Sequence, residues 1–241
     1  MKKIKILIYL ILFSLLSCTS FKVNLAFKLV GVYDDNIQLS KVTNEEKEVI
    51  FFPMHHLGTA PFYNDVKTKI DSLKKIGYFF YTEEVKGNKK DSITVRKSIK
   101  LTSIPFSRNN AGYKHFFDSI YNGKVKFKKE ILDQPSPSKF GLDESNSKTA
   151  DVTLKEMIDY YENKYGEIKL EPCDFEKSFY EKPNCKYKPA GKKVRDDVYI
   201  NFRNKNLIKM LLSDNHKKVA IIYGADHFKG IREELLKQGF K

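Results

Sequence analysis

Three short apolar runs, two of them separated by an amphipathic helix pattern, constrain the fold of this chain most strongly. The runs span residues 48–52, 78–82 and 219–223, a length typical of buried strands rather than buried helices. Between the first two, residues 62–76 carry apolar side chains at helical spacing and end before a glycine. Strand, helix and strand form a βαβ unit with a parallel strand pair. The sequence therefore predicts an α/β fold with a mixed, largely parallel sheet flanked by helices.

Turn residues, capping residues and weaker periodicities predict the other elements. A hairpin is expected over residues 29–42, with its turn at 34–36. Residues 86–150 form the least regular part and are interpreted as an insertion into a single domain that spans 29–241. The remaining expected elements are weak strands over 92–104, a helix over 115–121, a loop over 134–138, a helix opening at a capping Asp151, and helices over 197–212 and 229–238.

The N-terminus has the composition of an export signal. Three lysines among the first five residues precede an apolar run over 6–16, which is too short to span a bilayer comfortably. The run ends in Leu-Leu-Ser-Cys18, which is similar to a bacterial lipobox. We expect residues 1–17 to be a signal peptide, Cys18 to be lipidated, and 18–28 to tether the domain to a membrane of the cell envelope. Ordinary signal cleavage near Ser17 and an uncleaved anchor are the alternatives.

Export also bears on the other two cysteines, Cys173 and Cys185. An even pair in an oxidising compartment favours a disulfide, which would stabilise the fold by about 2–4 kcal/mol. A pair of metal ligands is the alternative, although the spacing lacks a CxxC arrangement.

The chain has a formal net charge of +14 at pH 7, which invites a comparison with nucleic-acid-binding proteins. The lysines are scattered among acidic residues, however, and no finger, helix-turn-helix or RNP pattern organises them. We therefore predict a solvated basic surface and no nucleic-acid partner.

Histidines follow two of the apolar runs and point to a site at one sheet edge. His55 and His56 follow the first run, and His227 follows the last, while Glu83 ends the middle run. Side chains at strand ends reach the edge where α/β sheets bind ligands. A set of His, Glu and His suits zinc and related ions. Because neighbouring residues of a strand point to opposite faces, His55 and His56 are not both expected on one ion.

Four motifs in order extend this pattern. They are Met54-His-His-Leu-Gly-Thr-Ala-Pro-Phe-Tyr63, Gly77-Tyr-Phe-Phe-Tyr-Thr-Glu-Glu-Val85, Asn201-Phe-Arg-Asn204, and Ile221-Ile-Tyr-Gly-Ala-Asp-His-Phe-Lys-Gly230 with Gly239-Phe240. Together they resemble the TraB/PrgY/Tiki (GumN-like) family, with its two G-x-x-H motifs, strand-end glutamate and Arg-Asn helix motif. The resemblance covers the chain from about Val49 onward, and Pro53 stands where the family usually carries glycine. It implies an α/β fold related to ChaN and erythromycin esterase proteins.

The resemblance also implies roles for individual residues. His56 and His227 would hold a divalent ion (Mn, Co or Zn), and Glu83 would be a third ligand or the general base.

Three further residues complete the implied site. Arg203 would bind a substrate carboxylate or stabilise the oxyanion. Asp226 would orient an imidazole or contact the substrate, and so would His55.

The implied function is metal-dependent hydrolysis of a peptide or small carbonyl substrate by an envelope-anchored lipoprotein. The alternative is a non-catalytic binding lipoprotein that captures a peptide, metal or haem in the same cleft. A free coordination position with an oriented Glu83 would favour the enzyme, and a closed site would favour binding.

Overall fold

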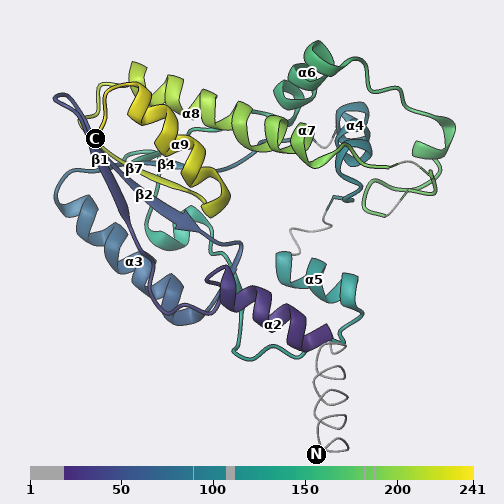
Figure 1. Cartoon of the computed structure of the whole chain (residues 1–241), viewed down its shortest axis with the longest axis horizontal. Helices are drawn as coiled ribbons and strands as arrows, with labels where there is room; N and C mark the ends of the chain where they lie inside the picture. The colour runs from purple at the N-terminus through teal and green to yellow at the C-terminus, as the bar shows by residue number, and fades with distance from the viewer. Residues whose placement is uncertain (1–18, 89, 107–111, 182, 187) are drawn as a thin grey trace, which may run out of the picture.

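The computed structural model describes residues 19–88, 90–106, 112–181, 183–186 and 188–241. Its larger sheet has five strands in the order β1-β2-β7-β4-β6 and lies on the left side of the view in Figure 1. Strands β2, β7, β4 and β6 run parallel, and β1 is antiparallel to β2. The strands are β1 Ser40–Thr43, β2 Glu48–Met54, β4 Phe79–Thr82, β6 Ser147–Thr149 and β7 Lys218–Gly224. The predicted α/β class, with a mixed and largely parallel sheet flanked by helices, is therefore confirmed.

The predicted βαβ unit is present, but its two strands are not neighbours. β2 leads through α3 (Ala60–Lys75) to β4, and β7 lies between these strands, pairing Met54 with Gly224 and Thr82 with Ile222. β7 is the most uniformly buried strand, with residues 219–223 at most 5% exposed. A strand that is apolar on both faces is stable where both faces and both edges are covered, which is the centre of the sheet.

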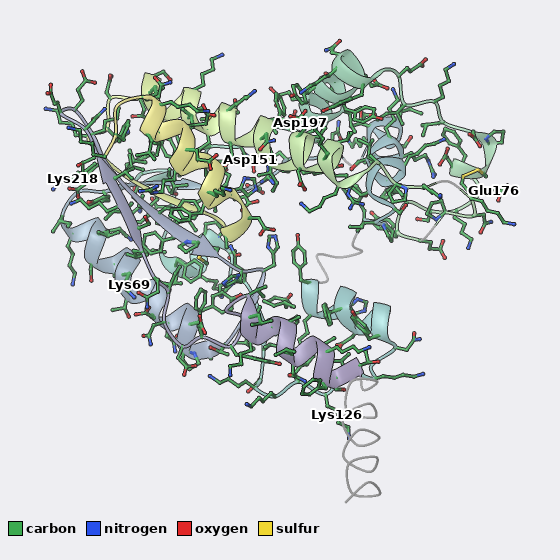
Figure 2. The ribbon with its side chains drawn as sticks, in the orientation of Figure 1. Lys69, Lys126, Asp151, Glu176, Asp197 and Lys218 are labelled. Atoms are coloured by element: carbon green, nitrogen blue, oxygen red, sulfur yellow. A yellow bond between two sulfur atoms is a disulfide. The ribbon has the colours of Figure 1, made fainter. Side chains whose placement is uncertain are left out.

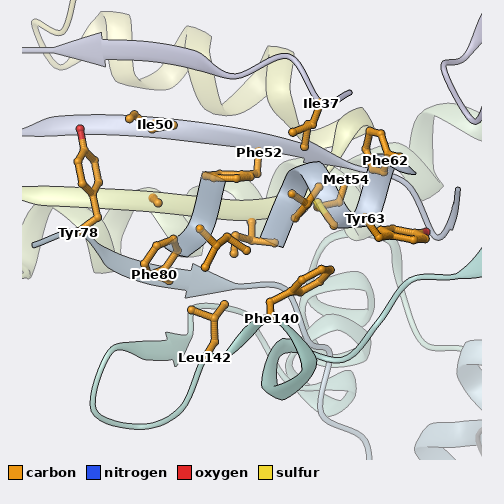
Figure 3. Close-up of a cluster of buried hydrophobic side chains, with 14 residues drawn as sticks. Ile37, Ile50, Phe52, Met54, Phe62, Tyr63, Tyr78, Phe80, Phe140 and Leu142 are labelled. Atoms are coloured by element: carbon orange, nitrogen blue, oxygen red, sulfur yellow. The ribbon is translucent and has the colours of Figure 1, made fainter. Parts of the chain in front are cut away.

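Two apolar clusters cover the two faces of the sheet. Alternate residues of each strand point to opposite sides, so Phe52 and Phe80 face α3 whereas Phe51 and Tyr81 face α8 (Phe202–Ser213) and α9 (Ala225–Lys237). The cluster on the α3 side includes side chains from the sheet, from α3 and from the loop around residue 140 (Figure 3). Apolar side chains therefore cover both faces, which leaves the edges of the sheet as the place for a ligand site.

The helix that follows β2 begins and ends as its sequence predicts. Thr59 is the N-cap of α3, and its hydroxyl accepts a hydrogen bond from the Phe62 N–H at 3.3 Å, with Pro61 in the first turn. The helix predicted over 115–121 is also found, as α5 (Tyr113–Tyr121).

A continuous helical segment carries the Arg-Asn motif. It consists of α7 (Lys192–Asp196), a π-helical turn (Asp197–Asn201) and α8, and it extends the predicted helix 197–212. α9 begins directly at Ala225, four residues before its predicted start, because β7 turns into this helix without a loop.

The first strand of the predicted hairpin is wrong, and the residues predicted as a tether are helical. Residues 19–29 form helix α2 (Thr19–Leu29), because Val23 and Phe27, four residues apart, bury their side chains with Val32 and Tyr33. β1 instead pairs with β2.

The weak strands predicted over 92–104 are also wrong. This segment is helix α4 (Ser92–Thr102), in which Val95 and Ile99 are buried four residues apart. Its β-branched residues suggest a strand, but Asp91 caps a helix by accepting a hydrogen bond from the Thr94 N–H at 3.1 Å. Residues 86–150, interpreted as an insertion, also supply β6 to the central sheet.

Asp151 does not cap the following helix as predicted. α6 (Leu154–Tyr165) has Thr153 as its N-cap, and Glu156 completes a capping box. Because Thr153 caps the helix, the carboxylate of Asp151 is free to bind other residues.

The disulfide between Cys173 and Cys185 is present, with a Cα–Cα distance of 5.4 Å. Asp174 lies beside it, so these three residues are grouped as metal ligands would be. Because the two sulfurs are bonded to each other, neither is a free thiolate, and the disulfide interpretation replaces the metal-ligand alternative. Cys18 and residues 1–17 lie outside the described residues. Among the described helices, none is both long and apolar enough to cross a membrane.

Candidate functional site

The carboxyl ends of the four parallel strands meet at one edge of the sheet, as the βαβ pattern predicts. Glu83 follows β4, Asp151 follows β6, His56 follows β2, and His227 lies in the first turn of α9 after β7. An open cleft of about 1510 Å³ runs along this edge, and its lining includes His56, Glu83, Tyr113, Arg203 and Asp226.

The side chain of Arg203 is the centre of a hydrogen-bonded network at this edge. Its Nε and Nη2 atoms donate to the two carboxylate oxygens of Asp151 at 2.9 and 2.6 Å, and Nη2 also donates to Oε1 of Glu83 at 2.6 Å. The Asp151 side chain is 0% exposed and that of Arg203 is 8% exposed. Asp151, near the middle of the view in Figure 2, also accepts the Glu84 N–H at 3.1 Å.

The other terminal nitrogen of Arg203 has two partners. Nη1 donates to the carbonyl of Tyr199 at 3.1 Å and to Nε2 of His227 at 3.2 Å. A guanidinium has five N–H groups, so the five contacts use all of them. Arg203 therefore has no N–H free for a substrate in this arrangement, and it holds other residues in place.

These contacts fix the protonation of His227. A guanidinium only donates, so Nε2 of His227 accepts, and Nδ1 carries the proton that is donated to Oδ1 of Asn204 at 2.6 Å. Burial, followed by the charge of Arg203, lowers the pKa of His227 to about 4. The imidazole is 3% exposed and is neutral at pH 7.

A glycine allows Asn204 to reach His227. A Cβ at Gly230 of α9 would lie 2.5 Å from Nδ2 of Asn204 on α8. The two helices therefore approach closely here, which is the kind of contact that requires a residue without a side chain.

Glu83 supplies the negative charge that faces the cleft. Its Oε2 accepts the Gly224 N–H at 2.6 Å, and Oε1 lies 3.6 Å from Nε2 of His227. Burial raises the pKa of Glu83, but the charge of Arg203 and the Gly224 hydrogen bond outweigh it and hold the pKa below its usual value. Two carboxylates against one guanidinium leave one net negative charge at the site.

His56 lies in the same cleft with an aromatic partner. Its ring stacks on Tyr113, with ring centroids 4.0 Å apart and an interplanar angle of 3°. His56 is exposed toward solvent, but partial desolvation in the cleft lowers its pKa, and the charges of Glu83 and Arg203 act on it in opposite directions. His56 is therefore neutral at pH 7 and within electrostatic reach of Glu83.

Of His55 and Asp226, only Asp226 shares the cleft with His56. His55 is half-buried, lies near the ring of Phe62 and, among the described residues, is not part of the cleft lining. Asp226 is exposed and lines the cleft, whereas the imidazole of His227 is oriented by Asn204.

The donor set does not fit the predicted divalent ion. The atoms of His227 and Glu83 that would bind a metal are instead bonded to the Arg203 guanidinium. Within the described part of the chain, His56, Glu83 and His227 do not come together as a metal-ligand group. An ion at this position would have to displace a buried cation that two carboxylates hold.

Sequence reasoning did not identify Asp151, Asn204 or Tyr113 as members of the site. Asp151 follows a polar strand, Ser147–Thr149, that has no apolar signal. Asn204 directly follows Arg203 in the Arg-Asn motif, which was the one available sign of its role.

No protein family, curated protein or solved structure matches this chain. The similarity to the TraB/PrgY/Tiki family thus rests on the four motifs and stays a prediction.

Proposed function

We propose that the cleft is the active site of a hydrolase that acts on a peptide or another small carbonyl substrate. The observation that supports this most directly is that an ionised Glu83 and a neutral His56 line the same cleft at the carboxyl edge of the sheet. The similarity of the motifs to the TraB/PrgY/Tiki family supports the same class. The lipid on Cys18 would hold the enzyme at a membrane of the cell envelope.

The proposed general base is His56. A neutral imidazole in the cleft takes a proton from the water that attacks the carbonyl carbon, and the negative charge of Glu83 stabilises the imidazolium that forms. Tyr113 is 51% exposed, but partial burial and then the charge of Glu83 raise the pKa of its hydroxyl, which therefore stays protonated. This O–H is a donor for the developing oxyanion.

Arg203 and Asp151 position Glu83 in this proposal and do not bind substrate. Because the donor set does not fit the predicted ion, no step passes through a metal. Metal analysis of the purified protein tests this point separately. A content of about one Mn, Co or Zn ion per chain that is lost in both His56→Ala and His227→Ala would restore the metal-dependent mechanism.

The test compares His56→Gln with His55→Gln on a library of peptides and esters. General base catalysis contributes about 10²- to 10⁴-fold, so His56→Gln should lower kcat by that factor and His55→Gln should leave it nearly unchanged. In the wild type, kcat should rise with pH through a pKa below 6.5 and then level off, because the base must be deprotonated. Equal activity of the two variants would remove His56 from the mechanism.

A binding protein is the second candidate, and one observation favours it. His227 is 3% exposed, and all five N–H groups of Arg203 are used within the protein. A peptide or haem that raises the unfolding temperature, is not turned over, and binds His56→Gln equally well would favour this candidate.

A further inference from the structure

Helix α2 has two apolar faces, and one of them is uncovered. Val23 and Phe27 are buried against the domain, together with Val125 and Ile131. On the opposite side, Phe21, Leu25 and Leu29 are 45%, 46% and 77% exposed. At about 100° per residue, these three side chains lie within an arc of about 80°. This exposed stripe, Phe21-Leu25-Leu29, is unusual for a water-facing helix surface.

Lysines border the stripe on both sides. At the same angular spacing, Lys28 lies about 20° beyond Phe21, and Lys22 lies about 20° beyond Leu29. Both lysines are exposed. An apolar stripe with a lysine on each side is typical of helices that lie in a membrane interface, where the ammonium groups reach the headgroups.

A second basic segment is fixed beside α2. In residues 124–128, Val125 and Phe127 pack inward, whereas Lys124, Lys126 and Lys128 are exposed. Phe127 stacks on Phe27 with ring centroids 5.8 Å apart. Lys126 is labelled beside α2 in Figure 2.

Hydrogen bonds hold this loop on the flank of the helix. Asn24 donates to the carbonyl of Lys126 at 2.8 Å and accepts the Lys128 N–H at 2.7 Å, and Ser20 accepts the Lys126 N–H at 3.0 Å. Ser20 and Asn24 lie between the buried face and the Phe21 edge of the stripe. Within the described residues, none of the five lysines (Lys22, Lys28, Lys124, Lys126 and Lys128) has an ion-pair partner.

We propose that α2 and the 124–128 loop form a docking surface for an acidic lipid bilayer, separate from any covalent lipid. The stripe enters the interface while the five lysines bind acidic headgroups. The place of α2 in the chain agrees with this occupant, because the helix begins directly after Cys18, the predicted lipidation site. The surface would fix the orientation of the domain on the membrane, and this inference does not depend on the proposed hydrolase.

The experiment uses the predicted mature chain, residues 18–241, because the apolar run 6–16 would enter vesicles by itself. Cys18→Ser leaves one introduced cysteine as the only free thiol. An environment-sensitive fluorophore is placed at Leu25→Cys on the stripe, and at Leu212→Cys on α8 as a control with similar exposure, 42% against 46%. The chains are mixed with vesicles of phosphatidylcholine, with or without phosphatidylglycerol. In acidic vesicles, we expect the emission of the Leu25 label to increase several-fold and to be quenched by brominated lipid. The emission of the Leu212 label should stay that of a label in water.

The role of the lysines is tested with the Leu25 label. The measured quantity is the amount of phosphatidylglycerol at which the change in its emission reaches half of its maximum. Each lysine near an acidic surface contributes about fivefold to binding, so Lys22→Gln with Lys28→Gln should raise that amount about 25-fold. The matched pair on α8, Lys205→Gln with Lys209→Gln, should leave it unchanged.

Three results would overturn the proposal. Equal exposure of the two labels to water in acidic vesicles would show that the stripe does not enter lipid. Equal insertion in neutral and acidic vesicles would remove the role of the lysines. Shielding of the Leu25 label without vesicles, increasing with protein concentration, would assign the stripe to a second copy of the chain.

Discussion

The buried guanidinium makes Arg203→Met the most informative substitution. Methionine retains much of the volume but none of the five N–H groups. It would leave Asp151, with a side chain 0% exposed, and Glu83, 18% exposed, without their cation. Removing one partner of a buried ion pair costs about 3–5 kcal/mol because the remaining charge is not compensated. We expect the free energy of unfolding at pH 7 to fall by that amount.

The pH dependence of the free energy of unfolding is a second, independent test of the charge argument. In the wild type, the pKa of Glu83 lies below its usual value, so this pairing contributes stability that is lost as the pH falls. Without Arg203, burial raises the pKa of Glu83, and protonation at lower pH then relieves the unpaired charge. The stability difference between Arg203→Met and wild type should therefore narrow as the pH is lowered.

Urea unfolding followed by far-UV circular dichroism measures both effects, because the chain has no tryptophan and urea adds no salt. Lys155→Met is the matched control. It breaks an exposed pair with Asp159, whose side chains are 66% and 48% exposed, and should change nothing measurable. A loss in Arg203→Met as small as in the control, or a difference that grows at low pH, would refute the charge argument.

Two further substitutions test the surroundings of the site. The pKa of His227 is about 4 in the fold against an ordinary 6.5, so the unfolded chain binds a proton that the folded chain does not between these pH values. The free energy of unfolding should drop by up to about 3 kcal/mol as pH falls from 6.5 to 4, and His227→Gln should remove this part of the slope in urea titrations. Gly230→Ala should cost about 1–3 kcal/mol, since its Cβ would meet Asn204 at 2.5 Å. Gly191→Ala, where a Cβ would meet nothing within 4 Å, should cost only about 0.5 kcal/mol because alanine is a poorer N-cap for α7 than glycine. Equal stability of these two glycine variants would contradict the close helix approach.

Sequence periodicity predicted the centre of the fold because its signals are local. The runs at 48–52 and 219–223 are apolar on both faces, and α3 has an N-cap, an apolar face and a following glycine. The errors arose where tertiary contacts outweigh local preference. Residues 92–102 are rich in β-branched side chains yet form a helix, because Val95 and Ile99 meet an apolar cluster with Leu154.

The site was predictable in position but not in connectivity. Strand ends predicted that Glu83 and His227 would lie near one another, and Oε1 and Nε2 are 3.6 Å apart. Arg203 and Asp151 are in contact although they are 52 residues apart in the sequence. Asp151 follows the polar strand β6, so no local pattern reveals this contact. Spacing also cannot show that a guanidinium binds the atoms that we expected a metal to bind.

The strand order has a consequence for when the protein can fold. β7 is central in space but is the last strand of the sheet along the chain. Until residues 218–224 are available, β2 and β4 have no common neighbour and each has an open edge, and pairing so distant in sequence forms slowly. A polypeptide emerging from the ribosome would thus complete its sheet late. Such a delay would suit the export that residues 1–17 predict, because a chain passes through a translocation channel before its core closes.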